Sequence, residues 1–382
     1  MYKRILMIAD SASFWTKNYV LNLLVAQGWE VVIFPIWEES EEMNRFYAEH
    51  GVTVYHDAHR LPVIRHIPRL RMWARIYLNA KALQKLGPFD VVHNHILSQR
   101  DLALGYLVHR RNPKSSWLAS FWGSDLLRVS VRSIRQLRFF LKRCDHVTTN
   151  AESAMPVMRK TFSEDIVQKT TVTYFGQHIY GTIDTLKANT DKRACKEYFG
   201  LNPDQPVLAL GYNASPTQHH LEMLDAIGRL PADVTRDWAL VLQITYGSND
   251  PAYLTQLKNA AQALLCRTLL LTDPMDETEC AYLRIAADVY VHAIPTDFLS
   301  ATLREYLYAG AQVLCGDWLP YPEFRSLGIE MIPFSTFGQL EQRLPEAVQA
   351  PISQAQLAKR LLLKGMFSWE AVGEKWNALY HK

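Results

Sequence analysis

Short apolar runs alternate with segments of helical periodicity from the beginning of the chain. Residues 3–10 form the first apolar run, residues 17–27 have helical periodicity and end at Gly28, and residues 30–36 form a second run. A short apolar run is typical of a buried strand, whereas apolar residues at every third or fourth position predict a helix. The chain therefore opens with a β-α-β unit.

The alternation continues in two series. Further strands are predicted at 89–95, 115–123, 146–150 and 171–175, and then at 206–213, 239–247, 268–273, 288–295, 311–317 and 330–335. Helical segments such as 219–230 and 251–266 separate them. This order predicts an α/β protein with two Rossmann-like, doubly wound parallel sheets.

The two series define the expected domains. We expect an N-terminal domain over 1–185, a C-terminal domain over 186–355, and a last helix over 356–382 that packs back on the N-terminal domain. Ligands of such sheets bind outside the carboxyl ends of the strands, so two sheets facing one another would enclose a binding cleft.

Length and composition agree with two folded domains. Of its residues, 48% are hydrophobic and 21% are charged, which is typical of globular proteins. A chain of 382 residues is too long for one ordinary core. The five cysteines form no C-x-x-C pair, which argues against a zinc site or a disulfide framework and favours a reducing cytoplasm. No apolar run approaches the length of a membrane span, so a membrane would matter only as a surface.

Two segments concentrate positive charge although the formal net charge is only +3. Residues 59–85 and 127–143 carry many Arg and Lys residues, no acidic residue, and interleaved aromatic and aliphatic residues. Such segments suit a peripheral contact with an anionic membrane and a lipid diphosphate. The alternative is a pair of solvated helix faces, and no nucleic-acid-binding motif accompanies the charge.

The loop 296–300 follows a predicted strand and precedes a predicted helix. Ser300 is a candidate N-cap, and the N–H groups of the first turn would form an anion site suited to a diphosphate, at Ala301, Thr302 and Leu303. Glu305 could then accept hydrogen bonds from a ribose diol, and Asp297 could reach the group that the phosphates carry. The alternative is a capped helix in which Glu305 only favours the positive end of the dipole.

The stretch from Asp297 to Glu305 resembles the E-x7-E motif of GT-B glycosyltransferases, especially glycosyltransferase family 4, with Asp297 in place of the first Glu. Five further stretches fall in the order expected of that family: 89–95, 120–128, 144–154, 173–179 and 210–227. The resemblance implies a GT-B architecture, a nucleotide-sugar donor held by the C-terminal domain and an acceptor held by the N-terminal domain. It also implies transfer without a metal or another cofactor.

The expected donor loops depart from the family pattern. Many members of family 4 place an Arg and a Lys near the stretch 211–220, where this chain offers Asn213, Ser215, Gln218, His219 and His220. Gly211 is a further donor-site candidate in this stretch. Tyr246 and Gly247 would border the nucleotide base, although a Gly at a strand-to-turn junction is an equally simple interpretation. These stretches also resemble, more weakly, the family that transfers 4-acetamido-4,6-dideoxygalactose.

The expected acceptor side departs as well. Trp122 stands where many relatives have a His facing the reacting sugar, and the loop 10–20, with Ser13 and Trp15, lacks the usual Gly-Gly pair. Trp122 could stack on a sugar or belong to the core. Asp125 could make the polar contacts that this His makes in relatives. Alternatively, Ser124 and Asp125 could cap a helix starting near Leu126.

His93 and His95 follow one another on a predicted strand with one residue between them. A metal site is disfavoured because no third ligand is apparent, while either His could be a general base or a structural residue. The candidate catalytic residues are Asp297, Asp125 and His95, and the acceptor-side candidates also include His93, Trp122 and Ser124.

The pattern as a whole predicts a cytoplasmic glycosyltransferase that moves a sugar from a nucleotide-sugar to a glycan or lipid-linked acceptor in cell-surface polysaccharide or glycoconjugate assembly. Two alternatives remain open, a non-catalytic GT-B scaffold that binds another glycosyltransferase and a GT-B sugar-nucleotide epimerase.

Overall fold

The computed structural model describes residues 3–37, 40–57, 61, 64, 66–247 and 250–381. The chain forms two compact units. We call Met1–Gly176 with Trp369–Lys382 the N-terminal unit and Gln177–Ser368 the C-terminal unit.

The N-terminal unit is built on a parallel sheet with the order β3-β2-β1-β4-β5-β6-β7 within the described residues. Its strands are β1 (Arg4–Ala9), β2 (Glu30–Pro35), β3 (Thr53–Val54), β4 (Val91–His95), β5 (Ser116–Phe121), β6 (His146–Thr149) and β7 (Thr170–Val172). The inner strand β1 pairs on both sides, with Ile5 opposite Val31 and Val91. It is almost wholly apolar because a parallel strand between two helix layers is buried on both faces.

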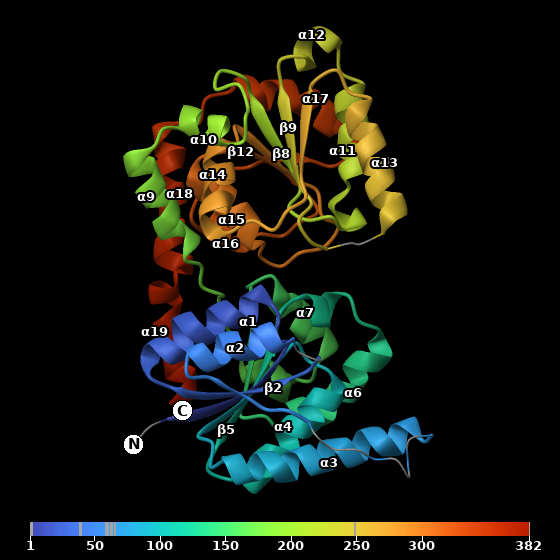
Figure 1. Ribbon diagram of the computed structural model, residues 1–382, viewed down its shortest axis with the longest axis vertical. Helices are drawn as coiled ribbons and strands as arrows, with labels where there is room; N and C mark the ends of the chain where they lie inside the picture. The colour runs from blue at the N-terminus through green and yellow to red at the C-terminus, as the bar shows by residue number, and fades with distance from the viewer. Residues whose placement is uncertain are drawn as a thin grey trace. The chain divides into compact units, whose positions relative to one another are not determined.

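Helices cover both faces of this sheet. They are α1 (Phe14–Tyr19), α2 (Glu41–Glu49), α3 (Pro68–Leu86), α4 (Gln99–Arg111), α5 (Ser124–Leu127), α6 (Val131–Leu141), α7 (Ala154–Thr161), α8 (Glu164–Gln168) and α19 (Trp369–Tyr380). After α1, the chain continues as a π-helical stretch, Val20–Leu24, and a 3-10 turn, Val25–Gln27. In Figure 1, α1 and α2 lie on one face of the sheet, and α3, α4 and α6 lie on the other.

The C-terminal unit repeats the plan with the strand order β10-β9-β8-β11-β12-β13 among the described residues. Its strands are β8 (Val207–Leu210), β9 (Ala239–Gln243), β10 (Arg267–Leu271), β11 (Val289–His292), β12 (Gln312–Gly316) and β13 (Ile332–Phe334). Every pairing is parallel, so the carboxyl ends of β8, β9 and β11 meet at one edge. That edge positions the loops described below.

The helices of this unit are α9 (Ile179–Asn189), α10 (Lys192–Tyr198), α11 (His220–Gly228), α12 (Ala232–Thr235), α13 (Pro251–Gln262), α14 (Glu277–Ala286), α15 (Ala301–Ala309), α16 (Pro322–Ser326), α17 (Phe337–Gln349) and α18 (Gln354–Phe367). Figure 1 shows α11 and α13 on one side of β8 and β9, and α14 and α15 on the other. Leu208 and Leu240 on the strands pack with Met223 of α11 in the main core cluster.

The structure confirms the predicted α/β class with two doubly wound parallel sheets. Each predicted strand corresponds to an observed one, and the sheet also contains β3, a two-residue strand that was not predicted. Residues 356–382, expected as one helix, belong to α18 and α19, which are separated at Ser368. Only α19 lies in the N-terminal unit. What each unit binds stays a prediction.

Two further predictions concern the cysteines and membrane-spanning helices. All five cysteines are free thiols, as their spacing predicts. Among the described residues, none of the helices is both long enough and apolar enough to cross a membrane.

Candidate functional site

The N-terminus of α15 lies directly after the loop that follows β11. Ser300 has non-helical backbone angles, φ −59° and ψ 126°, and its Oγ accepts a hydrogen bond from the Leu303 amide at 3.2 Å. The predicted N-cap is thus confirmed. Because a helix start has more N–H groups than acceptors, this cap leaves the amides of Ala301 and Thr302 for another acceptor.

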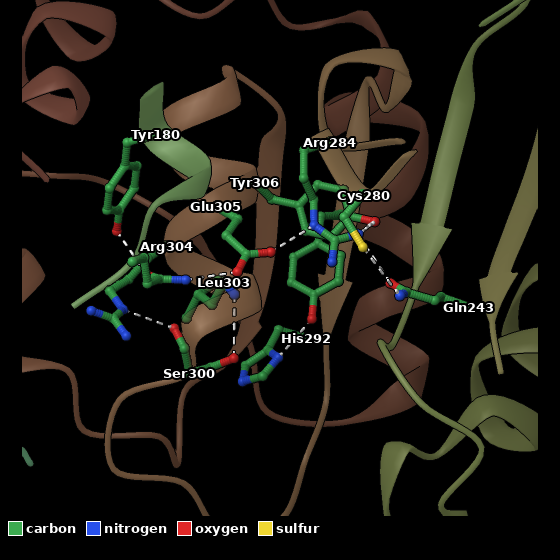
Figure 2. Close-up of polar contacts among 12 residues, drawn as sticks. Tyr180, Gln243, Cys280, Arg284, His292, Ser300, Leu303, Arg304, Glu305 and Tyr306 are labelled. Atoms are coloured by element: carbon green, nitrogen blue, oxygen red, sulfur yellow. Dashed lines mark hydrogen bonds and ion pairs between the residues drawn. The ribbon is translucent and has the colours of Figure 1, made fainter. Parts of the chain in front are cut away.

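Glu305 lies in the second turn of α15, and both of its carboxylate oxygens are engaged (Figure 2). Oε1 accepts from Gln177 Nε2 at 2.7 Å, and Oε2 accepts from Arg284 Nε at 2.9 Å. The Arg284 and Glu305 side chains are only 3% and 11% exposed. The predicted ribose ligand is therefore one half of a buried ion pair.

Arg284 connects Glu305 to the strands of the sheet. Its Nη1 donates to Gln243 Oε1, at the end of β9, and to the Tyr306 hydroxyl, each at 3.0 Å (Figure 2). The Tyr306 ring stacks on Tyr290, with ring centroids 4.1 Å apart. These contacts fix the guanidinium in one orientation, and so they also fix the Glu305 carboxylate.

A chain of hydrogen bonds continues from Tyr290 to the other motif carboxylate. The Tyr290 hydroxyl lies 3.1 Å from His292 Nδ1, His292 Nε2 lies 2.9 Å from the Tyr321 hydroxyl, and that hydroxyl donates to Asp297 Oδ2 at 2.8 Å. Burial lowers the pKa of His292 to about 3, so the imidazole is neutral. Since Tyr321 donates to Asp297, His292 donates from Nε2 and accepts at Nδ1. Asp297 and Glu305 therefore lie at the two ends of one continuous network of hydrogen bonds and stacked rings.

The predicted donor loops after β8 and β9 lie against each other. The Ala214 amide donates to the Tyr246 carbonyl at 2.5 Å, and Asn213 Oδ1 accepts from the Ser215 amide at 2.9 Å. Gly247 has a φ of +107°, and a Cβ there would lie 2.9 Å from Asn213 Oδ1. The structure thus brings Asn213, Ser215, Tyr246 and Gly247 together, as the donor-site prediction requires.

Gly211 begins the loop after β8 in a conformation that requires glycine. Its φ is +64°, and a Cβ would lie 2.5 Å from Nε2 of the fully buried His220. We expect Gly211→Ala to lower the free energy of unfolding by about 2–4 kcal/mol, because left-handed strain adds to overpacking. Thermal unfolding measures this effect.

Gly181→Ala is the matched control for Gly211→Ala. Gly181 lies in α9, and a Cβ there would meet no atom within 4 Å. This variant should be neutral or more stable by up to about 1 kcal/mol, because Ala favours a helix more than Gly does. Equal Tm values for the two variants would contradict the steric account of the Gly211 loop.

Asp125, in the N-terminal unit, holds the loop after β5. Its Oδ1 accepts from the Trp122 and Gly123 amides at 2.8 and 3.0 Å, and its Oδ2 accepts from the Leu97 amide at 2.9 Å. The expected capping of a helix near Leu126 is wrong: α5 begins at Ser124, and its N-cap, Gly123, has no side chain to cap with. The carboxylate instead binds amides that precede the helix, because the chain turns back toward them there. Burial raises the pKa of Asp125 to about 6.

The two histidines of β4 have different surroundings. His93 is fully buried, with Nδ1 2.9 Å from the Tyr380 hydroxyl and Nε2 2.6 Å from Ser120 Oγ. His95 Nδ1 accepts from Trp122 Nε1 at 3.1 Å, and burial lowers the pKa of His95 to about 3. His95 therefore carries its proton on Nε2, which has no hydrogen-bond partner among the described residues. This arrangement equips His95 to donate a hydrogen bond rather than to accept a proton.

The aromatic acceptor-side candidates meet around Phe175. Its ring lies 5.0 Å from that of Trp15 and 5.1 Å from that of Trp122. Trp15 is 40% exposed. Ser124 is exposed, and Ser13 is the N-cap residue of α1, although its side chain makes no capping hydrogen bond.

The predicted site residues thus form two sets. Asp297 and the donor-side candidates lie in the C-terminal unit, and Asp125, His95 and the acceptor-side candidates lie in the N-terminal unit. The roles of both sets in binding and catalysis stay predictions. Four residues of the network that holds Glu305 were not predicted from the sequence: Gln177, Gln243, Arg284 and Tyr306. Only Arg284, a lone charge in the apolar run 281–287, carries a signal in the sequence.

Within the described ranges, the His, Cys, Asp and Glu side chains form no group of three or more that could hold a metal ion. The start of α15 offers backbone amides and the positive end of a helix dipole, which are groups that attract anions. The expectation that no metal is needed stays a prediction.

Comparison with known proteins identifies the architecture. Residues 18–173 match the family model of Glycosyltransferase Family 4. Among curated proteins, none matches the sequence at a significant level.

Solved structures match the chain over nearly its whole length. A glycosyltransferase from Rickettsia africae is 14% identical with a TM-score of 0.75, and the match covers 99% of this chain and 98% of that one. HepE of Anabaena, at 14% identity and a TM-score of 0.70, is matched over 100% of both chains. Sucrose-phosphate synthase of Thermosynechococcus elongatus is 15% identical, with a TM-score of 0.70 and coverage of 99% and 98%.

The family match and the shared fold support a glycosyltransferase-type function. The chain has the GT-B fold, and it resembles glycosyltransferase family 4.

Proposed function

We propose that this chain transfers a sugar from a nucleotide-sugar donor to a glycan or lipid-linked acceptor in the assembly of cell-surface polysaccharide or glycoconjugate. The proposal rests on how the residues are arranged at the carboxyl edge of the C-terminal sheet. There the network joins Asp297 to Glu305 beside the capped start of α15. HepE, which has the same fold, is described in complex with UDP and glucose and with UDP-glucose.

In this proposal the diphosphate binds at the start of α15. Ser300 already satisfies the Leu303 amide, so the amides of Ala301 and Thr302 face the phosphate oxygens. As the bond to the sugar breaks, negative charge grows on the departing diphosphate. Amides that are already oriented stabilise this charge without further rearrangement. The transfer then needs no metal ion, in agreement with the family resemblance.

Glu305 can bind a ribose diol although Gln177 and Arg284 already donate to it. A carboxylate has about four lone-pair sites, and the two observed bonds use one on each oxygen. We assign Arg284 as a positioning residue that holds Glu305 in the orientation the ribose requires. At the other end of the network, Asp297, 20% exposed, is placed to contact the donor sugar.

For the acceptor we assign the aromatic cluster of the N-terminal unit. Trp15 and Trp122 offer ring faces on which a sugar can stack. The buried His95 holds the Trp122 ring, because its Nδ1 accepts from Trp122 Nε1. Exposed apolar side chains on α3, including Leu70 and Trp73, accompany its Arg residues. This mixture supports a cytoplasmic protein that contacts the inner face of the membrane. Arg60 and Arg65 of the basic segment lie outside the described residues.

The test is nucleotide binding, measured by calorimetry with UDP, TDP, GDP and their sugars. We expect one nucleotide to be selected and Glu305→Gln to weaken its binding about 10- to 100-fold, the usual effect of losing a hydrogen bond to a charged group. Glu305→Gln is preferable to Glu305→Ala because it retains the side-chain shape next to the buried Arg284. Glu346→Gln, an exposed acid of α17, is the matched control and should bind normally.

The outcomes separate the alternatives. No binding of any nucleotide by the unmodified protein would contradict the transferase proposal. Selective binding without transfer to any of a broad panel of acceptors would favour the non-catalytic scaffold. Isomerisation of the bound nucleotide-sugar without an acceptor would favour the epimerase.

A further inference from the structure

A large cavity lies in the N-terminal unit, and none of the residues assigned above to the donor or to the aromatic cluster lines it. Its volume is about 620 Å³, within the range of small-molecule sites. The walls come from the ends of β2 and β3 and from one face of α3 and α4. The helix α3 contributes positions spaced as one helical face: Pro68, Arg71, Met72, Arg75, Ile76 and Asn79. The cavity thus opens at the carboxyl edge of the sheet, where ligands of this fold class bind.

The cavity concentrates guanidinium groups. Arg75 pairs with Asp57 at 2.6 Å, and Arg100 pairs with Asp101 at 3.0 Å. Arg71 also lines the cavity, and among the described residues its side chain has no hydrogen-bond or ion-pair partner. The lining therefore has one more guanidinium group than carboxylate groups, which favours an anionic ligand.

The rest of the lining is aromatic and apolar. Phe34 and Tyr55 stack with ring centroids 5.6 Å apart, and Trp37 is 65% exposed, with the Arg100 guanidinium 5.9 Å from its ring centroid. Next to the cavity, the outward face of α3 exposes Leu70 at 49% and Trp73 at 41%. A ligand with an anionic group and an apolar part would match both surfaces.

We infer that this cavity binds an organic diphosphate, with Arg71 contacting the phosphate and the apolar part lying toward the exposed face of α3. The inference rests on the proposed function, for which it supplies the acceptor class: a sugar acceptor carried on a lipid diphosphate. A guanidinium group can donate two parallel hydrogen bonds to phosphate oxygens, and an unpaired one need not break an existing ion pair to do so. Arg75 and Asn79, both bonded to Asp57, form the floor beside it.

The experiment measures binding of farnesyl diphosphate and of inorganic pyrophosphate to the full chain by calorimetry, without any nucleotide-sugar. Arg71→Ala should weaken the binding of both about tenfold, the effect of removing one charge-assisted hydrogen-bonding group. Arg69→Ala is the matched control: it removes the same charge from the same helix, but Arg69 does not line the cavity. Both side chains are exposed, so neither variant should affect folding.

Tighter binding of farnesyl diphosphate than of pyrophosphate, with both weakened by Arg71→Ala alone, would support a lipid-linked ligand. Equal affinity for the two probes, again weakened by Arg71→Ala alone, would support a diphosphate site but overturn the lipid assignment. Equal weakening by Arg69→Ala, or no binding of either probe, would overturn the site itself. Nucleotide binding in the C-terminal unit is measured separately, so the failure of one proposal is distinguishable from the failure of the other.

Discussion

Acidification below about pH 6.5 should destabilise the protein steeply. Among the described residues, four histidines are buried: His93, His95, His220 and His292. Burial lowers the pKa of His95 and His292 to about 3, that of His220 to about 4, and that of His93 well below its usual value. In the unfolded chain each of them titrates near pH 6.5.

The sign of the effect follows from proton binding. Between about pH 6.5 and pH 3 the unfolded chain binds protons at these histidines and the folded chain does not, so stability is lost as the pH falls. At pH 5.5 the loss is about 1.4 kcal/mol per histidine, or about 3 kcal/mol for the two histidines of each unit. Protonation of Asp125 offsets about 1 kcal/mol of this loss of stability in the N-terminal unit. Its pKa is raised to about 6 in the folded state, so the folded chain binds this proton more readily than the unfolded chain over this pH range.

Thermal unfolding at pH 7.5, 6.5 and 5.5 measures the loss. For units of this size we expect Tm to fall between pH 7.5 and 5.5 by about 6–12 °C for the C-terminal unit and by about 4–8 °C for the N-terminal unit. His292→Gln removes one of the two buried histidines of the C-terminal unit. The unfolding transition of this unit should therefore depend less on pH in the variant, whatever the stability of the variant at pH 7.5. A Tm that does not change over this range would contradict the burial of neutral histidines.

Arg284→Met should destabilise the C-terminal unit by about 3–5 kcal/mol. The substitution leaves the Glu305 carboxylate buried without its cation, and removing one member of a buried pair costs more than the pair itself contributes. It also removes the donor to Gln243 and Tyr306. Urea unfolding measures the loss through the midpoint of the transition of this unit.

The double variant Arg284→Met with Glu305→Gln is the control. It removes both charges, so we expect it to regain at least half of the stability that the single variant loses. If the double variant were no more stable than Arg284→Met, the unpaired carboxylate would not be the cause. Nucleotide binding should be weak in both variants, because Glu305 is misplaced in one and neutral in the other.

The sheet topology could be predicted because each strand has a local sequence pattern of its own. Parallel strands covered on both faces are short apolar runs, and the helices between them have a different periodicity. The strand β3 was missed because two residues are too few to show a pattern. The Ser300 cap was also predictable, since a cap depends on residues within one turn.

The surroundings of Glu305 could not be predicted in this way. Its partners Arg284 and Gln177 are 21 and 128 residues away along the chain. No local rule places them beside it, because their positions depend on the packing of α14 and of the segment before α9. Asp125 shows the same limit: a capping rule predicted a helix contact, whereas the carboxylate binds the amides of two loops, one of them at Leu97.

The contacts of α19 have a consequence for how the protein emerges from the ribosome. Trp376 Nε1 donates to the Tyr174 carbonyl, and the Tyr380 hydroxyl contacts both Tyr19 and His93, so α19 completes the core of the N-terminal unit. This helix is translated only after the whole of the C-terminal unit. The unit that begins synthesis first is therefore the last to be finished, and its core cannot be completed before the C-terminal unit has been synthesised.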